Sequence, residues 1–252
     1  RIDAYCDLVP RAVARGELHG PFTVFVTDGG GSWPYAARPR PGAERSVTTA
    51  DVQSVCEAQR DRGVEVSLGW VHELQPGLAD VAADAGLVVV RRDLMVLRGE
   101  GVAAPVVPGV TLGWMTPQHP RLGVVNAAIG AAFGDSDVVV GSEPSPDLCW
   151  RLQSGRFRQI GAWDHAGAVG GGAHSPRGGV TELTGIGVIP RARRTGAGAA
   201  VTVALVVDAL AHRSDLVFLS ARDDRVAALY RRLGFETVGT ACAAEPMPSS
   251  AA

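Results

Sequence analysis

Apolar positions recur along the chain with periods near 3.6 and near 2, which predict helices and strands respectively. In the N-terminal half the pattern predicts helices over 7–15, 49–62 and 76–85 and strands over 22–26, 64–71 and 87–97. In the C-terminal half it predicts helices over 120–133, 146–155, 196–212 and 223–233 and strands over 110–114, 159–163, 166–171, 181–189, 216–220 and 236–243. Gly-rich turns join the strands between 159 and 189, so we expect these three to be antiparallel.

A segment of small residues and prolines, Gly99 to Pro108, is expected to link two domains, 1–105 and 106–252. Both sides of it share one order of elements. Residues 50–97 and 196–243 each contain a helix, a strand, a helix, a glycine turn and a strand. This echo indicates two related α+β halves.

The composition excludes several classes of protein. The 252 residues have a net charge of −2 and are 46% hydrophobic, too apolar and too weakly charged for a disordered chain. The sequence contains no apolar run of about 18 residues and no N-terminal signal segment, so we expect a cytoplasmic protein without a membrane partner. All 24 basic residues are Arg, and 26 acidic residues balance them, which argues against a nucleic-acid partner.

The spacing of the cysteines predicts no metal site, and the sequence lacks the common motifs of nucleophilic and metal-dependent hydrolases. Four scattered cysteines lack metal or disulfide spacing and are expected as small buried residues in a reducing compartment. No G-x-S-x-G or HExxH motif occurs. The chain begins at Arg1 rather than Met, so the native N-terminus is not defined.

The segment from 181 to 210 carries the strongest chemical signal. A strand ends at Pro190, an arginine-rich turn follows, and the glycines at 196 and 198 open a long helix. The first turn of a helix has main-chain N–H groups without intrahelical partners, and they favour an anion such as phosphate. The pattern Arg-x-x-Gly-x-Gly alone is weak, with roughly 0.4 matches expected by chance from this composition. Its position between a strand and a helix gives it weight.

These residues resemble motif A of the GNAT superfamily of acyl-CoA N-acyltransferases. The matching residues are Ile186 to Pro190, followed by Arg193, Gly196 and Gly198. Asp223 to Phe235 resembles the downstream helix of the family, with Asp223 where Asn is usual. The resemblance is specific over about 159–243. The N-terminal half resembles the reduced first half of tandem GNAT proteins, without a phosphate turn before its helix at Ala50.

The resemblance implies an α+β fold with a mixed, largely antiparallel sheet flanked by helices, and a second, reduced GNAT-like domain before it. It implies acetyl-CoA as acyl donor and no metal. Main-chain groups of Ile186, Gly187 and Val188 would pair with the pantetheine arm and the acyl carbonyl, with the Ile186 amide at the oxyanion. The pyrophosphate would be held by Arg193, Arg194, Thr195, Gly196, Ala197, Gly198 and Ala199, and Asp223 would lie beside the cofactor.

Two side chains are candidates for proton transfer. Tyr230 matches the family tyrosine that protonates the leaving thiolate, although its helical spacing also fits a core residue. Glu182 lies four residues before Ile186, on the same strand face unless a bulge intervenes. Glu182 or a water relay would take the proton from the amine; the alternative is a solvated strand residue.

Other polar and aromatic residues could wall an acceptor pocket between the halves. The candidates are Trp33, Tyr35, Trp70, Glu73 and Trp114, and a core or solvated role is the alternative for each. We expect His165 and His174 in Gly-rich surface turns near the cleft, and the role of Asp164 stays open.

The sequence therefore predicts an N-acetyltransferase that acts on a primary amine of a small molecule or peptide by direct attack in a ternary complex. A non-catalytic acyl-CoA-binding regulatory module and a purely structural protein are the alternatives. The acceptor, the length of the acyl group and the oligomeric state stay open, with a homodimer typical of the family.

Overall fold

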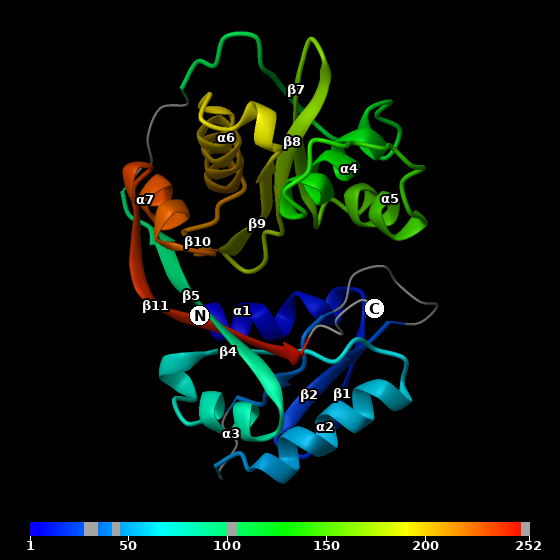
Figure 1. Ribbon diagram of the computed structural model, residues 1–252, viewed down its shortest axis with the longest axis vertical. Helices are drawn as coiled ribbons and strands as arrows, with labels where there is room; N and C mark the ends of the chain where they lie inside the picture. Colours follow the sequence, from blue (N-terminus) through cyan, green and yellow to red (C-terminus); the bar gives the residue numbers. More distant parts are fainter. Residues whose placement is uncertain (28–34, 42–45, 100–104, 248–252) are drawn as a thin grey trace. The chain divides into compact units, whose positions relative to one another are not determined.

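The computed structural model describes residues 1–27, 35–41, 46–99 and 105–247. The chain forms two compact units (Figure 1). Unit 1 contains residues 1–94, 220–223 and 237–252, and unit 2 contains 95–219 and 224–236. Strands β5 (Leu87–Leu97) and β11 (Phe235–Pro246) therefore each have residues in both units. The predicted domain boundary at 105 falls near residues outside the described ranges and stays a prediction.

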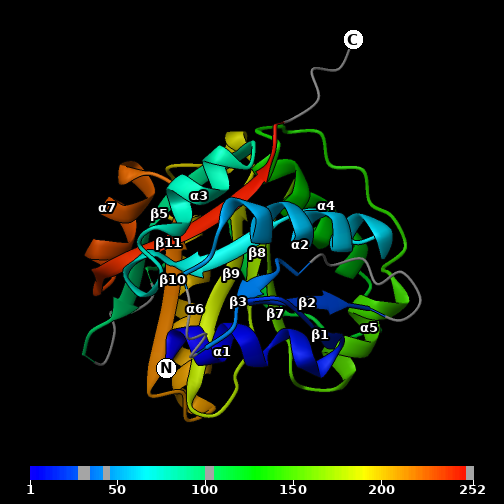
Figure 2. The same cartoon turned by 90° about the horizontal axis from the view of Figure 1, so that it is seen from below.

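Unit 1 is built around a small antiparallel sheet, β1 (Arg15–His19), β2 (Phe22–Val26) and β3 (Arg38–Pro39). Helices α1 (Ile2–Leu8) and α2 (Thr49–Asp61) lie on opposite sides of β2 (Figures 1 and 2). Strand β4 (Leu68–Val71) pairs antiparallel with β11, and α3 (Leu78–Asp84) completes the core. A capping box between Thr48 and Asp51 starts α2 where the sequence predicts it.

The predicted helix over 7–15 is wrong. The helix α1 ends at Leu8, a short 3-10 turn covers Pro10–Ala12, and β1 begins at Arg15. Pro10 explains the difference, because proline has no N–H to donate and its ring clashes with the preceding helical turn.

Unit 2 contains the greater part of an eight-stranded sheet whose order is β4, β11, β5, β10, β9, β8, β7, β6. Its strands are β6 (Thr111–Trp114), β7 (Arg158–Asp164), β8 (Gly167–His174), β9 (Val180–Val188) and β10 (Leu216–Ala221). The pairs from β6 to β9 are antiparallel, and β9 and β10 are parallel. Helices α4 (Leu122–Phe133) and α5 (Pro146–Gln153) lie on one face and α6 (Ala197–Ala211) on the other (Figure 1). The predicted α+β class with a mixed, largely antiparallel sheet is confirmed.

Strand β8 extends beyond its predicted end at Gly171 and reaches His174, and its glycines pack closely against both neighbouring strands. A Cβ at Gly170 would lie 2.0 Å from the carbonyl oxygen of Gly187, and one at Gly171 would lie 2.4 Å from that of Ile160. Only glycine permits such close approach of neighbouring strands. The predicted strand is thus tightly packed, and it continues to His174, which the sequence pattern places in a turn.

Candidate functional site

A bulge interrupts β9 within the predicted acyl-binding strand. Gly171 of β8 pairs with Gly187, and Ala173 pairs with Thr184, so Gly172 alone faces two residues of β9, Gly185 and Ile186. Gly185 has a φ of 61°, a left-handed conformation that glycine adopts at little cost. Ile186 therefore lies outside the regular pairing with β8.

The bulge overturns the expected alignment of Glu182 and the Ile186 side chain. A Cβ on Gly172 would lie 3.0 Å from Cγ1 of Ile186 and 3.1 Å from Cγ1 of Val201 in α6, so Ile186 faces α6. Thr181 also faces α6, because it bonds to His174 on that side. Side chains alternate along a strand, so Glu182 points to the opposite face. The half-buried Glu182 and the Ile186 side chain thus lie on opposite faces.

Strands β9 and β10 part after Glu182. Their register pairs are Leu216 with Val180, Val217 with Thr181 and Phe218 with Glu182. Both strands continue beyond this point. Within the described chain no register pair joins β10 to residues 183–188 of β9. Apart from the Val188 carbonyl, which accepts from Arg193, the main-chain groups on that edge are therefore open to an extended ligand.

The N-terminus of α6 has the geometry of an anion site. Gly196 precedes the helix with a φ of 99°, and its carbonyl accepts from the Ala200 N–H at 2.9 Å. The hydroxyl of Thr195 accepts weakly from the Ala197 N–H at 3.3 Å. The next two amides, of Gly198 and Ala199, have no intrahelical acceptor because the helix begins at Ala197. They lie at the positive end of the helix dipole.

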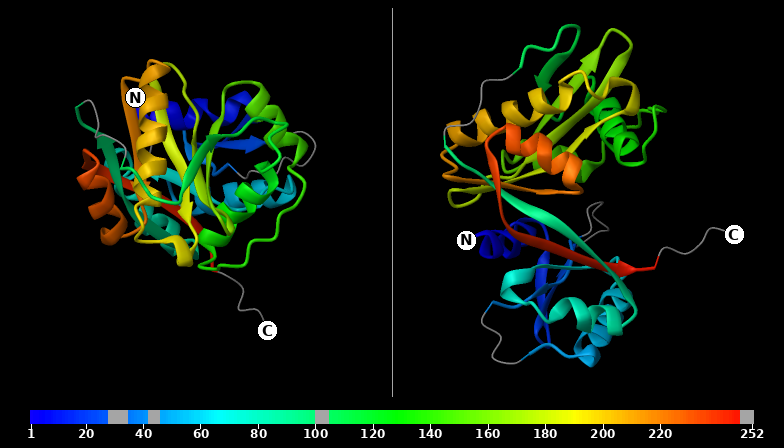
Figure 3. Two further views of the ribbon diagram at one scale, coloured as in Figure 1. Left: turned by 90° about the horizontal axis from the view of Figure 1, so that it is seen from above. Right: turned by 60° about the vertical axis from the view of Figure 1, so that its left-hand side comes forward.

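The space beside Gly198 is open enough for a ligand to approach. A Cβ there would have only ordinary contacts, 3.8 Å to Cγ2 of Val188 and 3.9 Å to Cδ2 of Leu229. Leu229 belongs to α7 (Asp224–Arg232), which lies beside the yellow helix α6 in Figure 3, right. We call the first-turn amides of Gly198 and Ala199 the cradle. The cradle is bordered by β9, α6 and α7, and its residues fit a phosphate group.

The arginines before α6 differ in what they contact. Arg193 donates to the carbonyl of Val188 at 2.9 Å and pairs with Asp135, and Arg191 pairs with Asp164 at 2.6 Å. Arg194 is exposed, has a φ of 64° and forms no ion pair with any residue that the structure describes. Arg193 therefore anchors the loop, whereas Arg194 has its charge available to an anion. Both phosphate roles stay predictions.

Tyr230 lies in α7 and is only 6% exposed. Its ring packs against Phe235 with centroids 5.9 Å apart. Burial raises the pKa of its hydroxyl to about 12, because the phenolate would lose solvation. The hydroxyl keeps its proton at neutral pH, as a general acid must.

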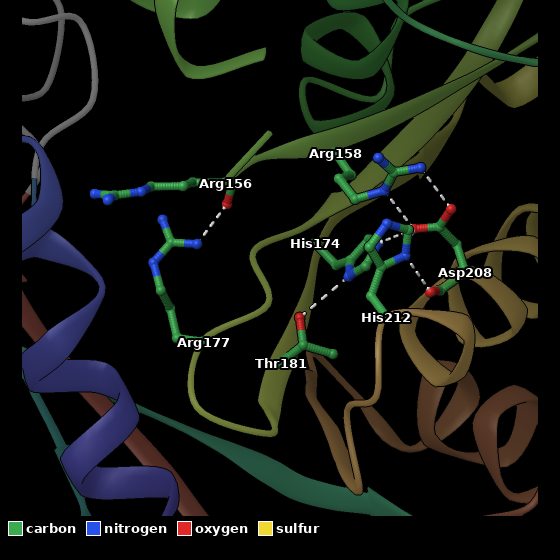
Figure 4. Close-up of polar contacts among 7 residues, drawn as sticks. All are labelled: Arg156, Arg158, His174, Arg177, Thr181, Asp208 and His212. Carbon is green, nitrogen blue, oxygen red and sulfur yellow. Dashed lines mark hydrogen bonds and ion pairs between the residues drawn. The ribbon is translucent and has the colours of Figure 1, made fainter. Parts of the chain in front are cut away.

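His174 does not lie in a surface turn, so that expectation is wrong. It is 0% exposed, its Nε2 lies 2.8 Å from Oδ2 of Asp208, and its Nδ1 lies 3.2 Å from the hydroxyl of Thr181 (Figure 4). Arg158 contacts both oxygens of Asp208, at 2.5 and 2.7 Å, and His212 lies 3.2 Å from the same carboxylate. No local sequence pattern indicates this network, because its members come from separate elements: β7, β8, β9 and α6 with its C-cap.

Thr181, His174 and Asp208 have the connectivity of a nucleophile, a base and an orienting acid. Thr181 and His174 are both 0% exposed, so no substrate reaches the hydroxyl. These three residues therefore do not act as a catalytic triad on a substrate, and their hydrogen bonds serve the structure of the fold. His165, in contrast, is exposed in the turn between β7 and β8 as expected, and Asp164 is the last residue of β7.

The network predicts an acid-sensitive fold. Burial lowers the pKa of His174 below 6.5, although Asp208 opposes the shift. Burial would raise the pKa of Asp208, but hydrogen bonds from Arg158 and His174 outweigh it and the pKa falls below 3.8. Neutral His174 thus contributes stability above pH 6.5 that is lost as the pH falls through its folded-state pKa, and Asp208 contributes a second loss below 3.8.

We therefore expect the free energy of unfolding, measured in urea, to decline as the pH falls from 7 towards 5. His174→Gln should flatten this decline, because glutamine does not titrate. His165→Gln, at an exposed position, should keep it. An equal slope in the two variants would show that His174 is not the titrating group.

The predicted acceptor residues have separate surroundings. Trp70 is buried in the core of unit 1, Glu73 accepts from the Thr240 N–H at 3.1 Å, and the ring of Tyr35 lies edge-on to Phe25. In unit 2, Trp114 lies 6.4 Å from the ring of His174 and 5.2 Å from the Arg158 guanidinium. Trp33 lies outside the described residues. An acceptor pocket of these residues stays a prediction. Asp223, before α7, is exposed and its carboxylate lies 3.2 Å from Arg222.

The described ranges hold neither a candidate metal site nor a candidate membrane span. They contain no group of three or more His, Cys, Asp or Glu residues placed to bind a metal ion. No helix in the same ranges is long and apolar enough to cross a bilayer.

Comparisons with known proteins identify a family for part of the chain. Residues 131–235 match the model of the acetyltransferase (GNAT) family. No curated protein sequence matches the chain. The structure resembles a GCN5-related N-acetyltransferase from Kribbella flavida, with 25% identity, a TM-score of 0.70 and coverage of 100% of this chain and 96% of that one.

Two further solved structures are similar in fold alone. A GCN5-related N-acetyltransferase from Sphaerobacter thermophilus has 17% identity and a TM-score of 0.60, covering 90% of this chain and 81% of that one. A tandem GNAT protein from the clavulanic acid biosynthesis pathway has 19% identity and a TM-score of 0.53, covering 91% and 79%. The resemblance found in the sequence is confirmed, and the tandem relative agrees with a second GNAT-like half.

Proposed function

We propose that this chain, which carries an acetyltransferase domain of the GNAT family at residues 131–235, transfers an acetyl group from acetyl-CoA to a primary amine of a small molecule or peptide. The family and its structural neighbours support acyl transfer in general. One observation carries the finer proposal. A bulged strand that parts from β10 after Glu182 ends just before a helix N-terminus suited to pyrophosphate.

The residues present fit acetyl-CoA. The amides of Gly198 and Ala199 would hold the pyrophosphate, and residues 183–188 of β9 would pair with the pantetheine arm. The bound thioester supplies an activated acyl carbon. The Ile186 N–H would donate to the acyl oxygen and stabilise the charge that develops there. Strand N–H groups lie near the sheet plane. The Ile186 N–H can therefore take this role even though the Ile186 side chain lies on the opposite face of the sheet from Glu182.

The proton steps fall to two side chains. Glu182 would take a proton from the amine, directly or through water, as the C–N bond forms. The C–S bond then breaks, and Tyr230 would give its proton to the thiolate sulfur. Solvent restores the proton on Tyr230 and removes the one from Glu182. No covalent bond to the protein is needed.

Calorimetric titration with acetyl-CoA tests the proposal first, followed by release of free CoA thiol across a panel of amines. Micromolar binding with turnover would support it. Binding without turnover across small amines, amino acids and peptides would favour a non-catalytic acyl-CoA-binding module. Failure to bind acetyl-CoA would overturn the acyltransferase assignment of this site.

Glu182→Gln is expected to lower kcat by about 100-fold, because the amide cannot take the proton. The acetyl-CoA Kd should stay within about twofold, since Glu182 lies outside the cradle. Glu143→Gln, an exposed carboxylate in the same unit, is the matched control and should leave kcat unchanged. A Glu182→Gln variant with wild-type kcat would move the proton transfer to a water relay without Glu182.

A further inference from the structure

The buried network around His174 has a defined direction of hydrogen bonding. The Asp208 carboxylate accepts from Arg158 through both oxygens, so it is ionised and can only accept. His174 Nε2 must then donate to Asp208 across 2.8 Å. In a neutral imidazole Nδ1 is left as an acceptor, so the Thr181 hydroxyl donates to it across 3.2 Å.

This chain of hydrogen bonds ends at Thr181 of β9, near the point where the pairing of β9 with β10 stops. Thr181 and Glu182 are the last residues of β9 with register partners on β10, namely Val217 and Phe218. Beyond them β9 is paired with β8 alone, and His174 itself is the β8 partner of Leu183. The network therefore anchors β9 immediately before the one-sided, bulged segment.

The other end of the network anchors α6. Asp208 lies eleven residues after Ala197, which is about 16 Å along the helix from the cradle. Asp208 connects this end of α6 to Arg158 of β7 as well as to β8 and β9. The helix that presents the cradle and the strand that presents Glu182 are thus joined through one buried imidazole.

We propose that Asp208, His174 and Thr181 are positioning residues that fix β9 relative to α6, and so hold Glu182 and the bulge in register with the cradle. The catalytic part of this inference rests on the proposed function. Its structural part does not: it says only that the hydrogen bond between Thr181 and His174 orders residues 183–188.

Protonation of His174 would reverse one bond. Imidazolium donates from both nitrogens, so the Thr181 hydroxyl would have to turn and accept. The charged and titratable groups that face the ring are Asp208 from α6, His212 at the C-cap of α6 and Arg158 from β7. The Trp114 ring of β6 lies edge-on to it. We therefore expect the order of residues 183–188 to fall at acid pH, together with any activity.

Two substitutions at Thr181 separate bonding from shape. Thr181→Val keeps the shape and removes the hydroxyl, whereas Thr181→Ser keeps the hydroxyl. Amide hydrogen exchange over 183–188, followed by mass spectrometry, should rise about tenfold in the valine variant and stay within about threefold of wild type in the serine variant. Thr23→Val, at a buried strand threonine of unit 1, is the matched control and should leave exchange over 183–188 unchanged.

Activity adds the catalytic readout. With an amine that the wild type acetylates, Thr181→Val should lower kcat about tenfold, with acetyl-CoA Kd within about threefold, and Thr181→Ser should restore kcat. Wild-type exchange in Thr181→Val, or equal defects in the valine and serine variants, would overturn the positioning role. If the wild type does not bind acetyl-CoA, the proposed function fails, and the exchange comparison still decides the structural part.

Discussion

Gly198→Trp is expected to abolish acetyl-CoA binding while leaving the fold intact. A methyl group at this position has only ordinary contacts with Val188 and Leu229, so the backbone tolerates a side chain. An indole would extend over the first-turn amides of α6 where the pyrophosphate is proposed to lie. We expect the Kd measured by calorimetry to rise at least about 100-fold, a loss of about 2.7 kcal/mol.

Two controls isolate the cause of that loss. Gly198→Ala adds only the methyl group and should bind within about threefold of wild type. Gly77→Trp places an indole where an added Cβ meets no described atom within 4 Å apart from its chain neighbours, and it should bind normally. The unfolding temperature of each variant reports the fold. A folded Gly198→Trp variant with wild-type affinity would exclude the α6 N-terminus as the cofactor site.

The second large effect is expected for Tyr230→Phe. The substitution removes one buried hydroxyl and keeps the packing against Phe235. If Tyr230 protonates the thiolate, kcat should fall about 100-fold, the size typical of a lost general acid. The pKa of about 12 means that the wild-type hydroxyl is protonated throughout the neutral range, so the effect should be present at every pH from 6 to 9.

The acetyl-CoA Kd of Tyr230→Phe should match wild type, because the cradle is untouched. Tyr5→Phe removes the hydroxyl of another buried tyrosine, in unit 1, and should keep kcat. Unchanged kcat in Tyr230→Phe would leave this tyrosine as a packing residue, the alternative that its helical spacing allows.

Much of the secondary structure follows from local pattern. The strand over 87–97 has the predicted bounds, and the helices that begin near 49, 122, 146 and 197 agree within a few residues. These elements have a strong apolar period and explicit start signals, such as the capping box at Thr48. The N-terminal helix was misplaced because the apolar period continues through Pro10, whereas proline ends the helix.

Glycine was the main source of error near the site. The sequence pattern ends the strand at Gly171 and leaves His174 in a turn, yet β8 continues to His174, and a Cβ at Gly170 or Gly171 would lie within 2.4 Å of a carbonyl oxygen of the neighbouring strand. That error placed His174 on the surface, although it is fully buried. Local composition cannot separate a glycine needed for a turn from one needed for close packing, because the second depends on a strand distant in sequence.

By itself, the sequence determined the α+β class, the order of most elements and the strand–turn–helix segment that resembles motif A. These depend on residues close together in the chain, whose periods and turn chemistry are readable directly. Only the tertiary structure decided the bulge at Gly185, the separation of β9 from β10 after Glu182 and the Arg158–Asp208–His174–Thr181 network. Each of these depends on register and burial between segments up to 50 residues apart. Pairing between distant segments is set by the packing of the whole sheet and its helices, which no local pattern contains.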